Sequence, residues 1–183
     1  GYIVYPWFFC PADNLHKKAE KAGVPYPLWK DQGFIEATPG NSIDFREVEA
    51  TIREVCERFE VREICFDKHM AAPITNNLLD DGYPVVNMPQ RGLLMAGAVK
   101  ELERTILAGK FQHGGHPILR WCFSNIHVVV NKYGDKEFHK GKSTGKIDGA
   151  VAAAMAVARA AAGEGSSPSI FDDPNVIAEM LVW

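Results

Sequence analysis

Long apolar runs are missing from this sequence, and their absence sets the first limits on what the protein can be. No window offers the roughly 20 consecutive apolar residues that a transmembrane helix needs. The alanine-rich stretch 150–162 comes nearest, but it is short and Arg159 interrupts it. The N-terminus has no basic segment before its apolar residues, which is typical of a strand rather than a signal peptide. We therefore expect no membrane partner and a cytoplasmic location.

Paired cysteines and a strong net charge are missing as well. The four cysteines are widely spaced and form no CxxC pair, which favours free thiols in a reducing compartment and argues against a zinc site. A formal net charge of −3 gives no overall basic signature for nucleic acid. What remains is ordinary for a globular protein: 183 residues, 46% of them hydrophobic, enough for one domain with a single core.

Charge is nevertheless unevenly distributed along the chain. Residues 132–146 hold five lysines and two acids, whereas residues 163–183 hold four acids and no lysine or arginine. The sequence therefore predicts a domain over residues 1–162 and an acidic C-terminal tail over residues 163–183. A basic segment of this kind is usually a solvated loop, so alone it does not name a partner.

Apolar periodicity and turn residues predict strands that alternate with helices. The predicted strands are 2–9, 34–37, 61–66, 84–88 and 126–130. The predicted helices are 13–22, 44–59, 71–81, 94–108, 117–125 and 147–162, with Asp13 and Asp44 as the first two N-caps. Residues 134–146 are predicted to be a loop rich in glycine and lysine. This order indicates an α/β fold with a sheet covered on both faces.

Asp67 is the first candidate for chemistry. It ends the apolar strand 61–66, and ligands of open α/β sheets collect beyond the carboxyl ends of strands. Position alone is equally compatible with an aspartate that only caps or turns the chain.

Asp148 is the second candidate. It begins the last predicted helix, where an acid is favoured by capping and by the helix dipole regardless of function. The alanines behind it make an unusually small helix face. Such a face would let the helix lie close to a sheet and would bring Asp148 near strand ends such as that of Asp67.

Two converging carboxylates repel each other unless a cation lies between them, and hard oxygen ligands suit Mg²⁺ or Mn²⁺. A pair of such ions could activate water against a phosphodiester. Lys140, Lys142 and Lys146 precede Asp148 and could contact the DNA backbone there. A phosphodiester nuclease is one coherent use of these parts. The His113-Gly-Gly-His116 segment, by contrast, is better interpreted as a turn than as a metal pair.

Several short motifs, in this order and spacing, resemble the nuclease domain of the large terminase subunit of tailed bacteriophages and prophages. Residues 64–67 (Ile-Cys-Phe-Asp) resemble its second acidic motif, and Lys140 with residues 145–152 resembles its C-terminal acidic motif. The other matching landmarks are Trp29, Gly33, 38–40, 43–44, 89–92, 101–103, 109–111, His113, 117–121 and Asn125.

The resemblance implies an RNase-H-like mixed sheet with helices on both faces. It also implies a divalent-metal endonuclease, with Asp67 and Asp148 as catalytic and metal-binding residues, that cuts concatemeric double-stranded DNA during genome packaging in the bacterial host cytoplasm. Partners implied in the same way are the packaging ATPase domain of the same subunit, the small terminase subunit and the portal.

The family's first catalytic aspartate lies on an opening strand upstream of residues 2–9. We therefore expect this chain to lack its opening strands and that acid, and to have weak or absent nuclease activity, whereas the complete domain would hold two metal ions. Two alternatives stay open: another RNase-H-like nuclease of the resolvase or transposase type, and a non-catalytic docking module.

Overall fold

The computed structural model describes residues 1–164, apart from the side chains of residues 68–73 and 164. Most of the predicted acidic tail, residues 165–183, lies outside the described residues. The helices are α1 (Leu15–Ala22), α2 (Tyr26–Asp31), α3 (Phe45–Arg58), α4 (Lys68–Asp80), α5 (Gly92–Leu107), α6 (Pro117–Ser124) and α7 (Asp148–Glu164), with a 3₁₀ turn η1 (Lys140–Lys142). Within these residues, no helix is long and apolar enough to cross a bilayer.

The strands are short, and they pair two by two. They are β1 (Tyr2–Ile3), β2 (Phe9–Pro11), β3 (Glu36–Thr38), β4 (Ile64–Phe66), β5 (Val85–Asn87), β6 (Phe111–Gln112), β7 (Val128–Val130) and β8 (Lys136–Phe138). The pairs β1–β6, β2–β3 and β4–β5 are parallel, and β7–β8 is antiparallel. The α/β class is as predicted, but the described strands form four two-stranded ladders rather than one covered sheet.

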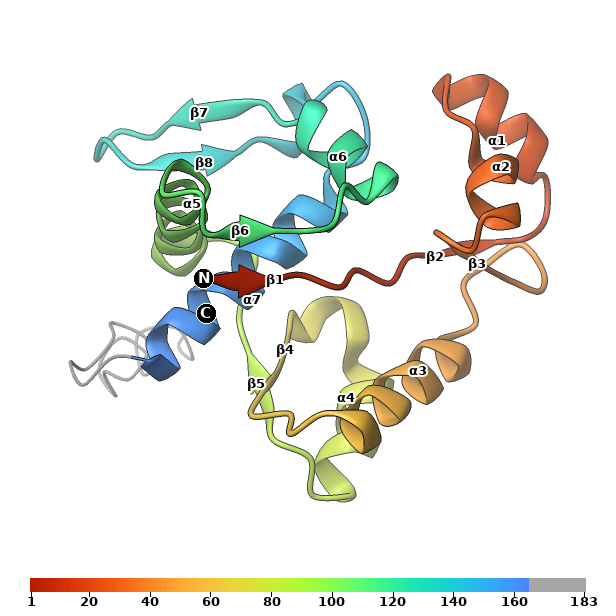
Figure 1. Cartoon of the computed structure of the whole chain (residues 1–183), viewed down its shortest axis with the longest axis horizontal. Helices are drawn as coiled ribbons and strands as arrows, with labels where there is room; N and C mark the ends of the chain where they lie inside the picture. The colour runs from red at the N-terminus through yellow and green to blue at the C-terminus, as the bar shows by residue number, and fades with distance from the viewer. Residues whose placement is uncertain (165–183) are drawn as a thin grey trace.

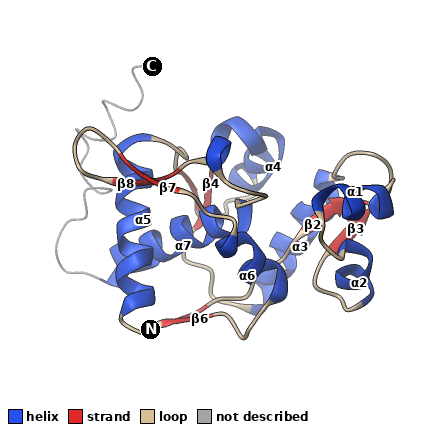
Figure 2. Cartoon of the chain, turned by 90° about the horizontal axis from the view of Figure 1, so that it is seen from above, coloured by secondary structure: helices blue, strands red, loops and turns tan. Residues whose placement is uncertain are grey.

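The N-terminal segment was predicted as one strand over residues 2–9, and the structure divides it. Its two ends pair with different partners. The Tyr2 amide donates to the Lys110 carbonyl at 2.8 Å, whereas the Phe8 carbonyl accepts from Glu36 at 2.7 Å. The extended chain between β1 and β2 thus joins the layer of α5 and β6 to a group made of α1, α2, β2 and β3 (Figures 1 and 2).

Local capping explains where the early helices begin. Asp44 caps α3 as predicted, because its Oδ1 accepts from the Arg46 amide at 2.9 Å. The predicted Asp13 cap was wrong: Asn14 precedes α1, in a left-handed conformation with φ of 58°. Helix α2 was missed, because its short sequence begins at Pro25-Tyr-Pro and resembles a turn.

The main core lies between α5 and α7. Ala98 and Leu102 of α5 and Ala154 of α7 are almost fully buried in one cluster. Ala150 belongs to a second cluster with Ile118 of α6. The small face of α7 therefore packs mainly against two helices, not mainly against a sheet as predicted. Alanine allows this close approach because it has no side chain beyond Cβ.

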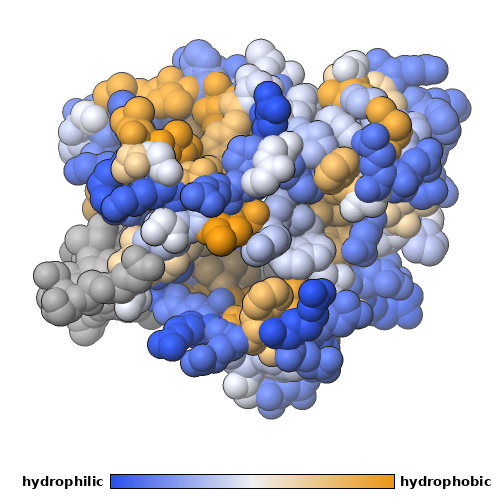
Figure 3. All heavy atoms as spheres, in the orientation of Figure 1, coloured by the Kyte–Doolittle hydropathy of each residue, from blue (hydrophilic) through white to orange (hydrophobic). Residues whose placement is uncertain are grey.

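The segment predicted as a loop over residues 134–146 contains a strand. Residues Lys136–Phe138 pair antiparallel with β7, and the Asn131 side chain closes the turn by accepting from the amides of Tyr133 and Asp135. Gly134 has φ of 88°, which a residue with a side chain rarely adopts. Figure 3 shows an apolar patch over this hairpin, where Val128 and Val130 are exposed.

Candidate metal and nucleic-acid site

Asp67 follows β4 directly and lies at the same edge as the end of β5. The two strands are parallel, with Phe66 opposite Asn87, so their carboxyl ends meet. The Asp67 Oδ2 accepts a hydrogen bond from the backbone amide of Gln90 at 3.2 Å, and Asp67 is half-buried. The predicted position of Asp67 beyond a strand end is confirmed. Its carboxylate is held by the loop after the neighbouring strand.

Asp148 is the first residue of α7, and its side chain is 68% exposed. The Nζ of Lys140, in η1, lies 3.7 Å from Asp148 Oδ1. The same ammonium donates to Gln90 Oε1 at 3.2 Å. A continuous line of contacts therefore runs from Asp67 through Gln90 and Lys140 to Asp148.

An ion pair at the far ends of β4 and α7 explains why the two aspartates share one end. Arg159, eleven residues after Asp148, donates through Nε and Nη2 to both oxygens of Glu63, each at 2.7 Å. Eleven helical residues span about 16 Å. The four residues from Glu63 to Asp67 span about 13 Å when extended. The helix and the strand therefore run antiparallel over similar lengths, with Asp67 and Asp148 at their common end.

The loop before Asp148 is held by Asn125, which is buried at the end of α6. Asn125 Nδ2 donates to the Lys146 carbonyl at 3.0 Å, and its Oδ1 accepts from the Thr144 hydroxyl at 3.2 Å. Between these contacts, a Cβ on Gly145 would lie 2.7 Å from Asn125 Nδ2. In the sequence, Asn125 stands out only as a landmark of the family resemblance. Gly145, between Thr144 and Lys146, was the one local signal that Asn125 packs closely against this loop.

Helix α7 also begins against its neighbours too closely for a side chain at Gly149. A Cβ there would lie 2.8 Å from Phe8 Cζ and 3.2 Å from Cys122 Sγ. The glycine lets the first turn of α7 contact both the N-terminal segment and α6. The backbone around Asp148 is thereby fixed, although its carboxylate is exposed.

The lysines of the predicted basic loop lie beside this end of the molecule, and all three are exposed. Lys140 and Lys142 belong to η1, whose start is capped by His139 Nδ1 accepting from the Lys142 amide at 3.2 Å. Lys146 follows on the segment that Asn125 holds. These charges could meet a phosphate backbone that approaches Asp148.

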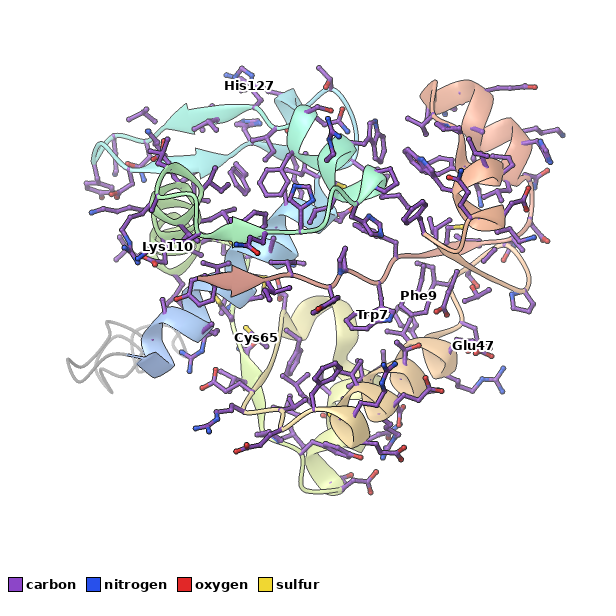
Figure 4. All side chains as sticks on the ribbon, viewed as in Figure 1. Trp7, Phe9, Glu47, Cys65, Lys110 and His127 are labelled. Atoms are coloured by element: carbon purple, nitrogen blue, oxygen red, sulfur yellow. The ribbon has the colours of Figure 1, made fainter. Side chains whose placement is uncertain are left out.

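The thiols near the site are poor candidates for metal binding or nucleophilic attack. Cys65 lies on β4, packed against the core (Figure 4), and burial raises its pKa to about 11. Burial also raises the pKa of Cys122, although the amides of Gly149 and Ala150 oppose that shift. Since thiolates are the reactive form, the chemistry of this site falls to the carboxylates.

The histidines of the 113–116 segment form a turn, as predicted. Gly114 and Gly115 have φ of 60° and 75°, and His116 Nδ1 accepts from the Leu119 amide to cap α6. Burial, and secondarily His113, lowers the pKa of His116. A neutral imidazole suits this cap, because only an unprotonated ring nitrogen can accept.

The donor chemistry fits a hard divalent cation. Within residues 1–164, the side chains that are described include no group of three or more His, Cys, Asp or Glu residues placed to hold a metal ion. Mg²⁺ does not require such a cage, because it usually keeps several waters and is bound by one or two carboxylates plus substrate phosphates. Asp67 and Asp148 could supply those carboxylates.

Comparison with known proteins gives one consistent result. Residues 2–164 match the family model described as the terminase large subunit, endonuclease domain. The large terminase subunit of Enterobacteria phage HK97 is 34% identical over 151 residues, covering 81% of this chain and 30% of that protein. Protein YmfN of Escherichia coli strain K12 is 30% identical over 165 residues, covering 87% of this chain and 36% of that protein.

A solved structure agrees. The crystal structure of the HK97 bacteriophage large terminase superposes with a TM-score of 0.80 at 33% identity, covering 86% of this chain and 33% of that one. The chain thus spans about a third of the length of these proteins.

Proposed function

This chain belongs to the family of terminase large subunit endonuclease domains, and on that premise we propose that it hydrolyses phosphodiester bonds of double-stranded DNA, using a divalent cation held by Asp67 and Asp148. The observation that carries the proposal is the line of contacts from Asp67 through Gln90 and Lys140 to Asp148. It supports a shared site for the two acids at the common end of β4 and α7.

The residues of the chain hold and orient the reacting groups. The backbone amide of Gln90 fixes Oδ2 of Asp67, so the carboxylate has a defined orientation at the end of β4. The first turn of α7 fixes the backbone of Asp148, while its exposed carboxylate can reach a cation. When bound, Mg²⁺ or Mn²⁺ would activate water and stabilise the leaving oxygen. We also propose that the domain has an RNase-H-like sheet.

Lys140, Lys142 and Lys146 are the proposed DNA-binding residues. Their exposure beside Asp148 supports contact with phosphate groups, which every DNA sequence presents. We expect this loop to hold the duplex near the acids without reading bases.

The wider role follows from the relatives. One of them is the terminase large subunit of phage HK97, and this chain spans about a third of its length. We infer that the domain cuts concatemeric double-stranded DNA during genome packaging in a bacterial cytoplasm. The packaging ATPase domain of the same subunit, the small terminase subunit and the portal are its proposed partners.

A plasmid-cleavage assay with matched variants tests the proposal. Supercoiled plasmid is incubated in Mn²⁺ and in Mg²⁺ with the chain carrying Asp67→Asn, Asp148→Asn or the control Asp31→Asn. Asp31 ends α2 and is exposed, so its variant makes the same chemical change away from the site. Because this chain spans about a third of the length of its relatives, the set is repeated in a longer version extended at its N-terminus.

We expect Asp67→Asn and Asp148→Asn each to reduce cleavage by at least about a hundredfold, while Asp31→Asn leaves it unchanged. Removal of one carboxylate weakens both metal binding and charge stabilisation in the transition state. Equal cleavage by all three variants would mean that the acids only cap and turn the chain. Absence of cleavage by every protein, the longer version without substitutions included, would instead favour the docking-module alternative.

A further inference from the structure

The ammonium of Lys140 lies where a cation would be attracted. It is 3.2 Å from Gln90 Oε1 and 3.7 Å from Asp148 Oδ1. The backbone N–H of Gln90 in turn donates a hydrogen bond to Asp67, so Lys140 is linked to both carboxylates. Its loop neighbours differ: among the residues that the structure describes, neither Lys142 nor Lys146 forms an ion pair. Lys140 therefore belongs to the acidic site as much as to the basic loop.

The Lys140–Asp148 pair is weak enough to be exchanged. The two side chains are 58% and 68% exposed, and exposed ion pairs contribute about 0–1 kcal/mol. A separation of 3.7 Å is also longer than a charge-assisted hydrogen bond of roughly 2.8 Å. A divalent cation carries twice the charge and can bind the carboxylate oxygens directly. It can therefore displace the ammonium, which a tight buried pair would resist.

We propose that Lys140 is the counter-ion of the Asp67–Asp148 site before a divalent cation binds, and that it moves from Asp148 to a DNA phosphate when the cation arrives. This inference rests on the proposed function. Lys140 is then a positioning residue: it offsets carboxylate repulsion in the metal-free protein, and it couples metal binding to DNA binding. Coupling of this kind is reciprocal, so DNA also strengthens metal binding.

A titration with Mn²⁺ in the absence of DNA tests the first half, because it needs no catalysis. Calorimetry compares the wild-type chain with Lys140→Met, which keeps the apolar stem and removes the charge. Lys142→Met is the control on the same turn, and Lys140→Arg restores the charge. Circular dichroism melts check that all four proteins are folded.

Lys140→Met should bind Mn²⁺ about five to ten times more tightly, since a competing positive charge a few ångströms away is gone. Lys142→Met and Lys140→Arg should stay within about twofold of the wild type. Unchanged or weaker binding by Lys140→Met would overturn the inference. Failure of the proposed function gives a different result: the wild type and Asp148→Asn would then bind Mn²⁺ equally or not at all.

DNA binding tests the second half. The affinity of a short duplex is measured with and without Ca²⁺, a hard cation that takes oxygen ligands. Addition of Ca²⁺ should strengthen DNA binding at least about threefold more in the wild type than in Lys140→Met, because only the wild type gains a released ammonium. Equal gains in the two proteins would contradict the transfer of Lys140 to phosphate.

Discussion

The guanidinium of Arg159 forms two hydrogen bonds, both 2.7 Å long, with the carboxylate of Glu63. Glu63 precedes β4 and Arg159 lies near the end of α7, so the pair joins the two elements at the end opposite Asp67 and Asp148. Arg159 is only 14% exposed, which protects the pair from solvent. This ion pair sets how α7 is aligned along β4.

Removal of this ion pair should destabilise the fold and loosen the site. Arg159→Met keeps an apolar stem but leaves Glu63 without its bidentate partner, and we expect a loss of about 2 kcal/mol in the free energy of unfolding. Urea denaturation of Arg159→Met, Glu63→Gln and the double variant measures the coupling. Additive single effects would show that the two residues do not act together.

Gly149 should be intolerant of a methyl group. A Cβ at Gly149 would lie 2.8 Å from Phe8 Cζ, so Gly149→Ala should cost about 1–3 kcal/mol of stability through overpacking. Gly163→Ala is the matched control in the same helix, because a Cβ there meets nothing within 4 Å among the residues that the structure describes. It should be neutral or slightly stabilising, as alanine favours helix. Equal destabilisation by both variants would contradict the close approach at Gly149.

Acid should weaken the α6 cap through His116. Burial holds the pKa of His116 below its usual 6.5, so the unfolded chain takes up a proton at higher pH than the folded one. The stabilising contribution is therefore complete above about pH 6.5 and is lost as the pH falls through the folded pKa.

The variant His116→Asn keeps an acceptor for the Leu119 amide but does not titrate. Urea midpoints at about pH 7.5 and about pH 5.5 should differ less in this variant than in the wild type. An equal acid-induced loss in both proteins would remove His116 from the explanation.

The basic loop should determine the salt dependence of DNA binding. Replacement of Lys142 and Lys146 with alanine should lower the slope of log affinity against log salt by about 1.8, since each phosphate contact contributes about 0.9 on duplex DNA. The control removes Lys17 and Lys21 of α1, an equal loss of charge from an exposed helix. A slope that falls equally in both double variants would mean that net charge, not this loop, governs binding.

Local signals in the sequence predicted the parts of the fold that depend on near neighbours. Asp44 caps α3 through an amide two residues away, so a short window was enough to identify it. Strand β6 was missed because it has only two residues, and β8 was missed because the glycines and lysines around it indicate a loop. The partner of β6 is β1, with Phe111 paired to Tyr2 far earlier in the chain, and no local pattern encodes such pairing.

The candidate site also combines features that near neighbours determine with contacts between distant residues. Asp67 and Asp148 were nominated from a strand end and a helix start, and both elements are present. What joins them could not be inferred, because Lys140 and Gln90 are 50 residues apart and Arg159 and Glu63 are 96 residues apart. These contacts depend on the packing of α7 against α5, α6 and β4, which follows only from the tertiary structure.

The central claim is that Asp67 and Asp148 share a divalent cation, and anomalous diffraction from a crystal soaked in Mn²⁺ tests it most directly. We predict an anomalous peak roughly 2.1 Å from one carboxylate oxygen of each aspartate. The ammonium of Lys140 should then lie farther from Asp148 Oδ1 than the present 3.7 Å. A peak bound to only one of the two aspartates, or no peak near either at saturating Mn²⁺, would contradict the shared site.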